Sequence, residues 1–281
     1  MKSVLPILIV AMPVLAQVAT RDLVLKTFQE ARPEPTAKKS AASAQAKKPP
    51  SARRQESIVG LTLWHMRAAQ GSDQVKFRGL VHDSDKPDDD AVWTAERASM
   101  DAPLATSEFL RLSIESARKG YLYVIDRDVY ADGAMSEPNL VFPTRRLLGG
   151  DNRVEPGVPI EIPGSDDRPP VFRMQKTRDD QVSVRLILIV APEPIREIDP
   201  KQNARKLSSE LLAAWERQWG AKVQQFSNPS SIGAAYTTAE QEAARKGAHP
   251  LSPQDPAPSM LMKSSASTEQ PMLSAVVLKI Q

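Results

Sequence analysis

The side chains able to do chemistry lie closest together between residues 82 and 90. This stretch holds one histidine and five aspartates: His82, Asp83, Asp85, Asp88, Asp89 and Asp90. A histidine beside carboxylates can act as a general base or help to hold a metal ion. The spacing matches neither HExxH nor a His-x-His pair, so a solvated acidic loop is the simpler interpretation. We treat the six residues as a candidate contact loop, and His82, Asp83 and Asp85 as the core of an alternative hydrolase hypothesis.

No other segment carries a recognisable catalytic or metal-binding pattern. Residues 126–133 are rich in oxygen donors but fail the donor spacing of an EF-hand, which also needs a glutamate at its twelfth position. The other two histidines, His65 and His249, are isolated in sequence, and the chain contains no cysteine. A zinc site would therefore need carboxylates from distant segments. With no G-x-S-x-G or phosphate-loop motif either, the sequence predicts no catalytic residue, no metal and no cofactor.

Composition narrows the class of partner. The 281 residues include 37 basic and 34 acidic side chains, a formal net charge of +3. Such a nearly balanced chain is not typical of a nucleic-acid-binding protein. It supports at most a mild attraction to anionic surfaces.

The first 16 residues have the layout of a secretory signal peptide. Lys2 precedes an uncharged apolar run from residue 4 to residue 15, and Ala16 supplies a small residue before the expected cleavage point. Cleavage after Ala19 is the second choice. The run is shorter than the roughly 20 residues that span a bilayer. We therefore expect an exported protein, periplasmic or extracellular, that does not span the membrane after cleavage.

Residues 17–55 are expected to form a flexible, Pro/Ala/Lys-rich N-terminal segment. Within it, residues 21–28 could form one or two helical turns, whereas residues 32–55 have too few apolar side chains to fold. Three basic pairs, at positions 38–39, 47–48 and 53–54, punctuate this part. The globular domain is then expected to cover residues 56–281.

Strand patterns dominate that domain. Residues 109–115 alternate apolar and polar side chains, and residues 117–120 form a turn that leads into 121–125, a segment apolar on both faces. Further strands are expected at 58–64, 92–93, 140–142, 160–162, 171–174, 182–190 and 275–278, and a long connection at 126–138. The pattern predicts a mainly β fold, an antiparallel β-sandwich-like domain with one or two added helices.

The helices are expected near the C-terminal end of the domain. Leu207, Leu211, Trp215 and Trp219 recur at four-residue steps, which predicts a helix that buries one face and ends at Gly220. Residues 238–246 have the composition of a second, capped helix, and 247–271 resemble a Pro/Ser-rich loop. The aromatic side chains could line a sugar-binding face, but their spacing is more typical of core packing.

One series of short motifs resembles a known family. The motifs are Leu-x-Leu-x-Ile-Glu-Ser from residue 110, Gly-Tyr-Leu-Tyr-Val-Ile from 120, Asn-Leu-Val-Phe-Pro from 139 and Asn-x-Val-x-Pro-Gly from 152. In this order they resemble a bacterial domain-of-unknown-function family of exported β-sandwich-like modules, often fused to Ser/Thr kinase or caspase-like peptidase domains. The resemblance covers residues 107–195 and implies no catalytic residue.

These observations favour an exported, non-enzymatic interaction or binding module at the bacterial cell envelope. Its partner would be another envelope protein or a cell-wall polymer, not a nucleic acid. Two alternatives stay open, an envelope hydrolase with an unrecognised site and a carbohydrate-binding module that uses exposed tryptophans.

Overall fold

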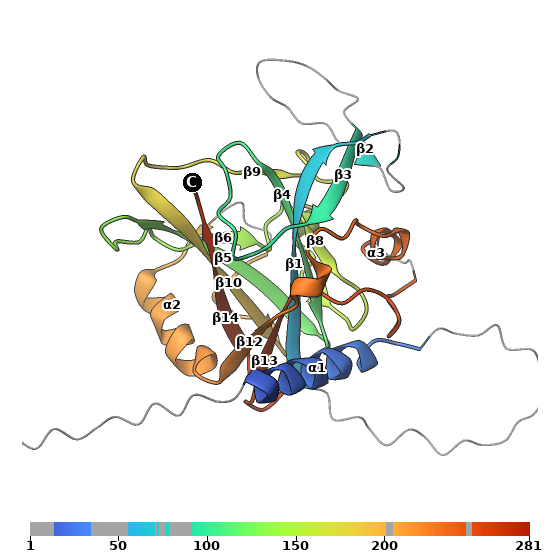
Figure 1. Ribbon diagram of the computed structural model, residues 1–281. Helices are drawn as coiled ribbons and strands as arrows, with labels where there is room; N and C mark the ends of the chain where they lie inside the picture. The colour runs from blue at the N-terminus through green and yellow to red at the C-terminus, as the bar shows by residue number, and fades with distance from the viewer. Residues whose placement is uncertain are drawn as a thin grey trace, which may run out of the picture.

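The computed structural model describes residues 14–34, 56–70, 72, 77–78, 92–200, 205–245 and 249–281. Their strands form two antiparallel sheets that pack face to face, with three α-helices outside them (Figure 1). The mainly β, sandwich-like architecture predicted from strand periodicity is confirmed.

The first sheet is built around one long strand, β1, which pairs with β4 along one edge and with β13 and β3 along the other. Strand β12 extends the sheet beyond β13, β2 extends it beyond β3, and β8 and β9 pair with β4. Its strands among the described residues are β1 (Ser57–Ala68), β2 (Phe77–Arg78), β3 (Val92–Arg97), β4 (Phe109–Ser116), β8 (Ile160–Ile162), β9 (Phe172–Arg173), β12 (Val223–Ser227) and β13 (Met260–Ser264).

The second sheet has two long strands at its centre, β5 and β10, which pair over almost their full length. The C-terminal strand β14 pairs with the other edge of β10, as the sequence predicts. Its strands among the described residues are β5 (Gly120–Tyr130), β6 (Asn139–Phe142), β7 (Arg153–Val154), β10 (Gln181–Ala191), β11 (Arg205–Lys206) and β14 (Met272–Lys279).

The main core lies between the sheets. Leu61 and Leu63 of β1 meet Leu122 and Val124 of β5 in one buried cluster. The intervening residues of β5, such as Tyr123, face the opposite side and are buried under α2. This double burial explains why residues 121–125 are apolar on both faces, since side chains alternate between the faces of a strand.

One connection links the two sheets, and another differs from expectation. The turn after β4 carries the chain from the first sheet to the second, so consecutive strands β4 and β5 belong to different sheets. The long connection predicted at 126–138 is wrong, because β5 continues to Tyr130 and a tight turn with Gly133 at a positive φ returns the chain. The polar side chains at 126–128 are only partly buried, so β5 can include them without removing them fully from solvent.

Helix α2 (Ser209–Trp215) and a π-helical turn, η2 (Glu216–Gly220), cover the outer face of the second sheet. The predicted helix ends at Gly220 as expected but starts later, because Ser208 caps it and Leu207 packs from the preceding loop. Leu212 is therefore fully buried and Leu211 only partly. Trp215 is buried as predicted.

Helix α3 (Thr238–Ala243) lies on the opposite side of the molecule, over the first sheet (Figure 1). Thr237, one residue before the predicted start, is its N-cap and forms a capping box with Glu240. The short helical turns η1 (Leu148–Gly150) and η3 (Pro229–Ser231) lie in loops. The loop predicted at 247–271 is partly wrong, since β13 lies within it and pairs with β1 and β12.

The N-terminal segment requires the largest correction. Residues 17–55 were predicted to be flexible, yet helix α1 (Val14–Glu30) packs on the first sheet, with Val24 and Phe28 buried against Ile58. Arg32 is buried as well. The folded body therefore includes residues well before position 56. Residues 35–55 lie outside the described residues. Among the helices that the structure describes, none is both long and apolar enough to cross a membrane.

Candidate site: a layer of buried ion pairs on the first sheet

The candidate contact loop predicted from the sequence lies outside the described residues. His82, Asp83, Asp85, Asp88, Asp89 and Asp90 all fall in this stretch, so their role stays a prediction. His65 lies on β1, half-buried, and His249 is exposed in a loop. Within the described part of the chain, no group of three or more His, Asp or Glu side chains is arranged to hold a metal ion.

The oxygen-rich segment 126–133 acts as a strand and a turn. Asp128 accepts hydrogen bonds from the Thr177 hydroxyl and from the Gln181 amide, each at 2.7 Å, which ties β5 to the segment leading into β10. Asp126 lies on the same face of β5, and burial raises the pKa of its carboxyl to about 6. Asp132 accepts from the backbone N–H of Ala134 and shapes the turn. Asp128 and Asp132 therefore form structural hydrogen bonds within this hairpin and to the neighbouring segment.

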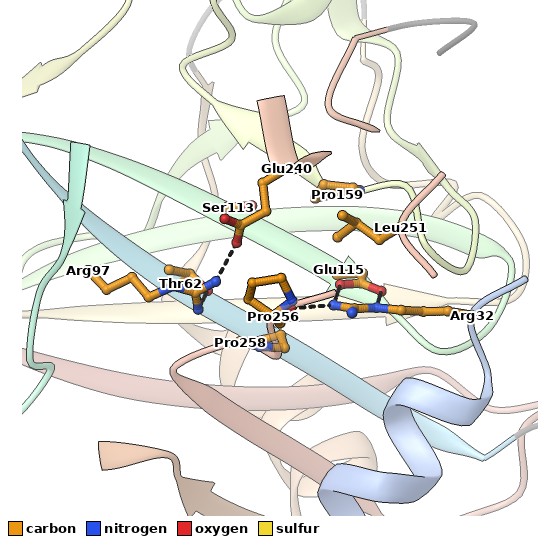
Figure 2. Close-up of a pocket in the computed structure, with 10 residues that line it drawn as sticks. All are labelled: Arg32, Thr62, Arg97, Ser113, Glu115, Pro159, Glu240, Leu251, Pro256 and Pro258. Atoms are coloured by element: carbon orange, nitrogen blue, oxygen red, sulfur yellow. Dashed lines mark hydrogen bonds and ion pairs between the residues drawn. The ribbon is translucent and has the colours of Figure 1, made fainter. Parts of the chain in front are cut away.

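One recess among the described residues lies on the outer face of the first sheet, the face turned away from the second sheet, and Figure 2 shows the residues that line it. Its cavity volume is about 10 Å³, the room that one water molecule needs. The sheet contributes its floor, and residues 250–258, α3 and the segment after α1 contribute its walls. The lining residues are Arg32, Thr62, Arg97, Ser113, Glu115, Pro159, Glu240, Leu251, Pro256 and Pro258.

Alternation along the strands explains why charged residues gather on this face. On β4, Leu110, Leu112 and Ile114 point into the core between the sheets, so Arg111 and Glu115 must point outward. A sheet face carrying charges normally meets water. Here α1, α3 and residues 250–258 cover it, so each charge needs a partner inside the protein.

The first pair joins the N-terminal segment to β4. The Arg32 guanidinium donates to both carboxylate oxygens of Glu115, from Nε and from Nη2, at 2.8 Å each (Figure 2). The Arg32 and Glu115 side chains are 1% and 5% exposed. Such a fork-to-fork arrangement is the strongest geometry that an arginine and a carboxylate can adopt.

The second pair joins β3 to α3. Arg97 Nη2 donates to Glu240 Oε1, and Arg97 Nη1 donates to the Ala257 carbonyl at 2.7 Å. The Arg97 guanidinium also lies over the Trp64 ring, 4.9 Å from its centre. Burial lowers the pKa of Arg97, and the Glu240 carboxylate opposes that shift. Glu240 Oε2 meanwhile accepts from the backbone N–H of Thr237, so one carboxylate serves both the ion pair and the helix cap.

The third pair lies farther along the same face. Arg111 Nη1 donates to Glu161 Oε2 at 3.2 Å, and the Tyr236 hydroxyl donates to Glu161 Oε1. Burial raises the pKa of Glu161, while Arg111 acts to lower it. Burial and the neighbouring carboxylate both raise the pKa of the Tyr236 hydroxyl, so this group stays protonated and serves as a donor.

We call these three pairs the buried ion-pair layer. Each carboxylate faces an arginine, which does not release its proton at physiological pH. A general acid or base must exchange protons near neutral pH and must reach a substrate. The recess of this layer has room for about one water molecule, so a larger substrate could reach these carboxylates only if the covering segments moved. The arrangement is suited to holding polypeptide segments on the sheet.

Sequence reasoning did not identify this layer. Its partners are separated by 83, 143 and 50 positions along the chain. The alternation on β4 and the capping box at Thr237 are visible in the sequence. Neither pattern indicates which residue would pair with Arg111, Glu115 or Glu240.

The aromatic side chains are core residues, as their spacing predicts. Trp64, Trp93 and Trp215 are buried, and Trp219 is half-buried against Trp215 with the two rings stacked at 5.3 Å. All four tryptophans lie in the described part of the chain, and none is exposed. They therefore do not form the exposed platform that a carbohydrate-binding module would use.

Comparisons with protein-family models, with curated proteins and with solved structures gave no match for this chain. The resemblance of residues 107–195 to a family of exported modules therefore stays a prediction.

Proposed function

We propose that this protein is an exported, non-enzymatic interaction module of the bacterial cell envelope that binds another envelope protein or a cell-wall polymer. The buried ion-pair layer is the observation that supports it most. Three arginine–carboxylate pairs hold polypeptide segments against a sheet, and the recess between them has room for about one water molecule. The chemistry of this face is that of polypeptide binding.

Export follows from the N-terminal sequence pattern, and the structure bears on what would remain after cleavage. The side chains of α1 that pack on the first sheet, Val24 and Phe28, lie after the expected cleavage point at Ala16. The same holds for Arg32. The mature protein would therefore keep every one of these contacts.

The candidate contact loop provides the test. Wild-type protein and a triple variant, Asp88→Asn, Asp89→Asn and Asp90→Asn, would be crosslinked in envelope extracts at low and high salt. We expect the same folding stability for both, because isolated surface charges contribute little. The variant should recover less of a basic partner, and the difference should shrink at high salt because salt screens exposed charges.

One outcome would exclude the contact loop, and another would contradict the proposal itself. Equal recovery of the same partners by both proteins would exclude the loop as the contact site. Turnover of an envelope substrate that is lost in His82→Ala, with folding intact, would establish the hydrolase alternative instead.

A further inference from the structure

The N-terminal arm, residues 17–34, packs on the first sheet, where α1 lies beside β13 and β1 (Figure 1). We call the surface that it covers, which includes Ile58, Gly60, Pro258 and Leu261, the groove. Val24 and Phe28 lie one helical turn apart on the same face of α1 and are 3% and 1% exposed. They pack on Ile58 of β1 and Leu261 of β13. The opposite face of the helix meets solvent, where Leu23 is 63% exposed. The arm therefore binds the body through one narrow stripe.

Arg32 continues this stripe and enters a socket made for a guanidinium group. Besides its two bonds to Glu115, it donates to the backbone carbonyls of Ser252, Asp255 and Pro256 at 3.2, 2.8 and 2.9 Å. These five hydrogen bonds match the five N–H groups of a guanidinium. A lysine ammonium has only three donors and no planar fork, so the socket distinguishes arginine from lysine.

The groove for Phe28 depends on a glycine in β1. A Cβ atom at Gly60 would lie 2.3 Å from Pro258 Cγ and 3.0 Å from Phe28 Cζ. Any other residue would push Pro258 and the Phe28 ring off the strand. The groove and the socket are thus formed by β1, β4, β13 and residues 252–258, and the arm supplies only the ligand side chains.

Resting on the proposed interaction function, we infer that this groove is a helix-binding site that the arm fills within the same chain. Its partner is a segment of another protein in which an amphipathic helix presents an aliphatic and an aromatic residue one turn apart. An arginine follows four residues after the aromatic residue, just beyond the end of the helix, as Arg32 follows α1. Charge complementarity supports this assignment, because a buried Glu115 must be matched by a cation whenever the site is occupied. Val24, Phe28 and Arg32 show which pattern fits.

Tethering decides which competitor can displace the arm. Residues 35–55 connect the arm to the body, and a peptide connection of this length gives an effective concentration on the order of mM. The arm of a second copy has the same contacts, so it would exchange only near mM protein. A partner helix that binds about 1,000-fold tighter would displace the arm at μM concentrations.

The test uses the full-length chain and a fluorescent peptide of residues 17–34. In wild-type protein the groove is occupied, whereas the double variant Phe28→Ala, Arg32→Ala weakens the tethered arm. We expect the labelled peptide to bind the double variant at least tenfold tighter than wild type by fluorescence anisotropy. A peptide carrying Arg32→Lys is the matched control and should bind at least tenfold more weakly. Equal binding of the two peptides would overturn the guanidinium socket.

A second measurement tests the inference without the double variant, in case that variant does not fold. A protease recognition sequence placed between residues 40 and 46 allows the arm to be cut from folded wild-type protein. After dilution to 1 μM, gel filtration should show release of the arm and uptake of the labelled peptide. Retention of the arm without exchange, or unfolding on its release, would overturn the inference, because the arm would then be part of the core. If the protein forms dimers at μM concentration by exchanging arms, the groove binds the arm of a second copy. That result would reject a helix of another protein as its partner.

These outcomes are separate from those of the proposed function. If no partner is crosslinked in envelope extracts but the peptide exchanges normally, the envelope partner is rejected and the helix-binding groove is supported. If a partner is captured but the peptide does not exchange, the groove is rejected and the envelope function is supported.

Discussion

Removing the charge of Glu240 should destabilise the protein far more than removing a charge at the surface. In Glu240→Gln the side chain keeps its length and its reach to the cap of α3, but Arg97 loses its carboxylate partner. The Arg97 side chain is 1% exposed, and its neutral acceptors would be the Ala257 carbonyl, the Thr62 hydroxyl and the single amide oxygen of the new side chain. The cap at Thr237 needs that same amide oxygen. Breaking a buried pair by removing one partner costs roughly 3–5 kcal/mol. That is a large part of the 5–15 kcal/mol that a typical domain has in total.

The free energy of unfolding would be measured by urea denaturation followed by tryptophan fluorescence. The matched control is Glu137→Gln, which breaks an ion pair with Lys206 whose side chains are 66% and 76% exposed. This control should change stability by less than about 1 kcal/mol. The denaturant slopes of both variants should stay close to wild type, because neither changes the area exposed on unfolding.

A loss within about 1 kcal/mol for Glu240→Gln would refute this reasoning, because Arg97 would then find water or another acceptor. The double variant Arg97→Met, Glu240→Leu adds a second check. Replacing a buried pair by apolar residues of similar volume is often neutral. We therefore expect the double variant to be more stable than Glu240→Gln alone, and a simple sum of two losses would contradict the pairing.

Three further predictions concern other parts of the chain. Trp215→Ala should cost about 3–5 kcal/mol and lower the melting temperature without altering binding, because the ring is buried between α2 and the second sheet. A near-neutral result would identify an exposed stripe. Burial raises the pKa of Asp126 from 3.8 to about 6. Between these pH values the folded chain keeps a proton that the unfolded chain has lost, so the free energy of unfolding should fall as the pH rises. Asp126→Asn should remove that fall, roughly 2–3 kcal/mol, in urea titrations at pH 4 and pH 7. N-terminal sequencing of exported protein should start at Gln17, or failing that at Thr20, and a start at Met1 would reject the signal peptide.

The sequence by itself determined the strands and the class of the fold. Residues 121–125 are apolar on both faces and residues 182–190 are nearly all apolar, and both segments form central strands covered on two sides. Local periodicity suffices here, because a side chain's face is fixed by its position along the strand. The sequence also predicts that the helix with Trp215 and Trp219 ends at Gly220, because glycine commonly follows the end of a helix.

The packing of the N-terminal arm on the first sheet depends on the tertiary structure. The sequence predicts a flexible segment because residues 32–55 contain too few apolar side chains to fold and residues 21–28 suffice for only one or two helical turns. The groove beside Gly60 and the socket at Glu115 supply the missing contacts from residues that lie far along the chain. No local pattern records that complementarity.

Tertiary structure also decided the buried ion-pair layer. Arg97 and Glu240 are 143 positions apart and look like ordinary surface residues in sequence. They became buried partners because α3 and residues 250–258 cover a sheet face that would otherwise meet solvent. A charge is forced to pair only once it is removed from water, and that removal is a property of packing.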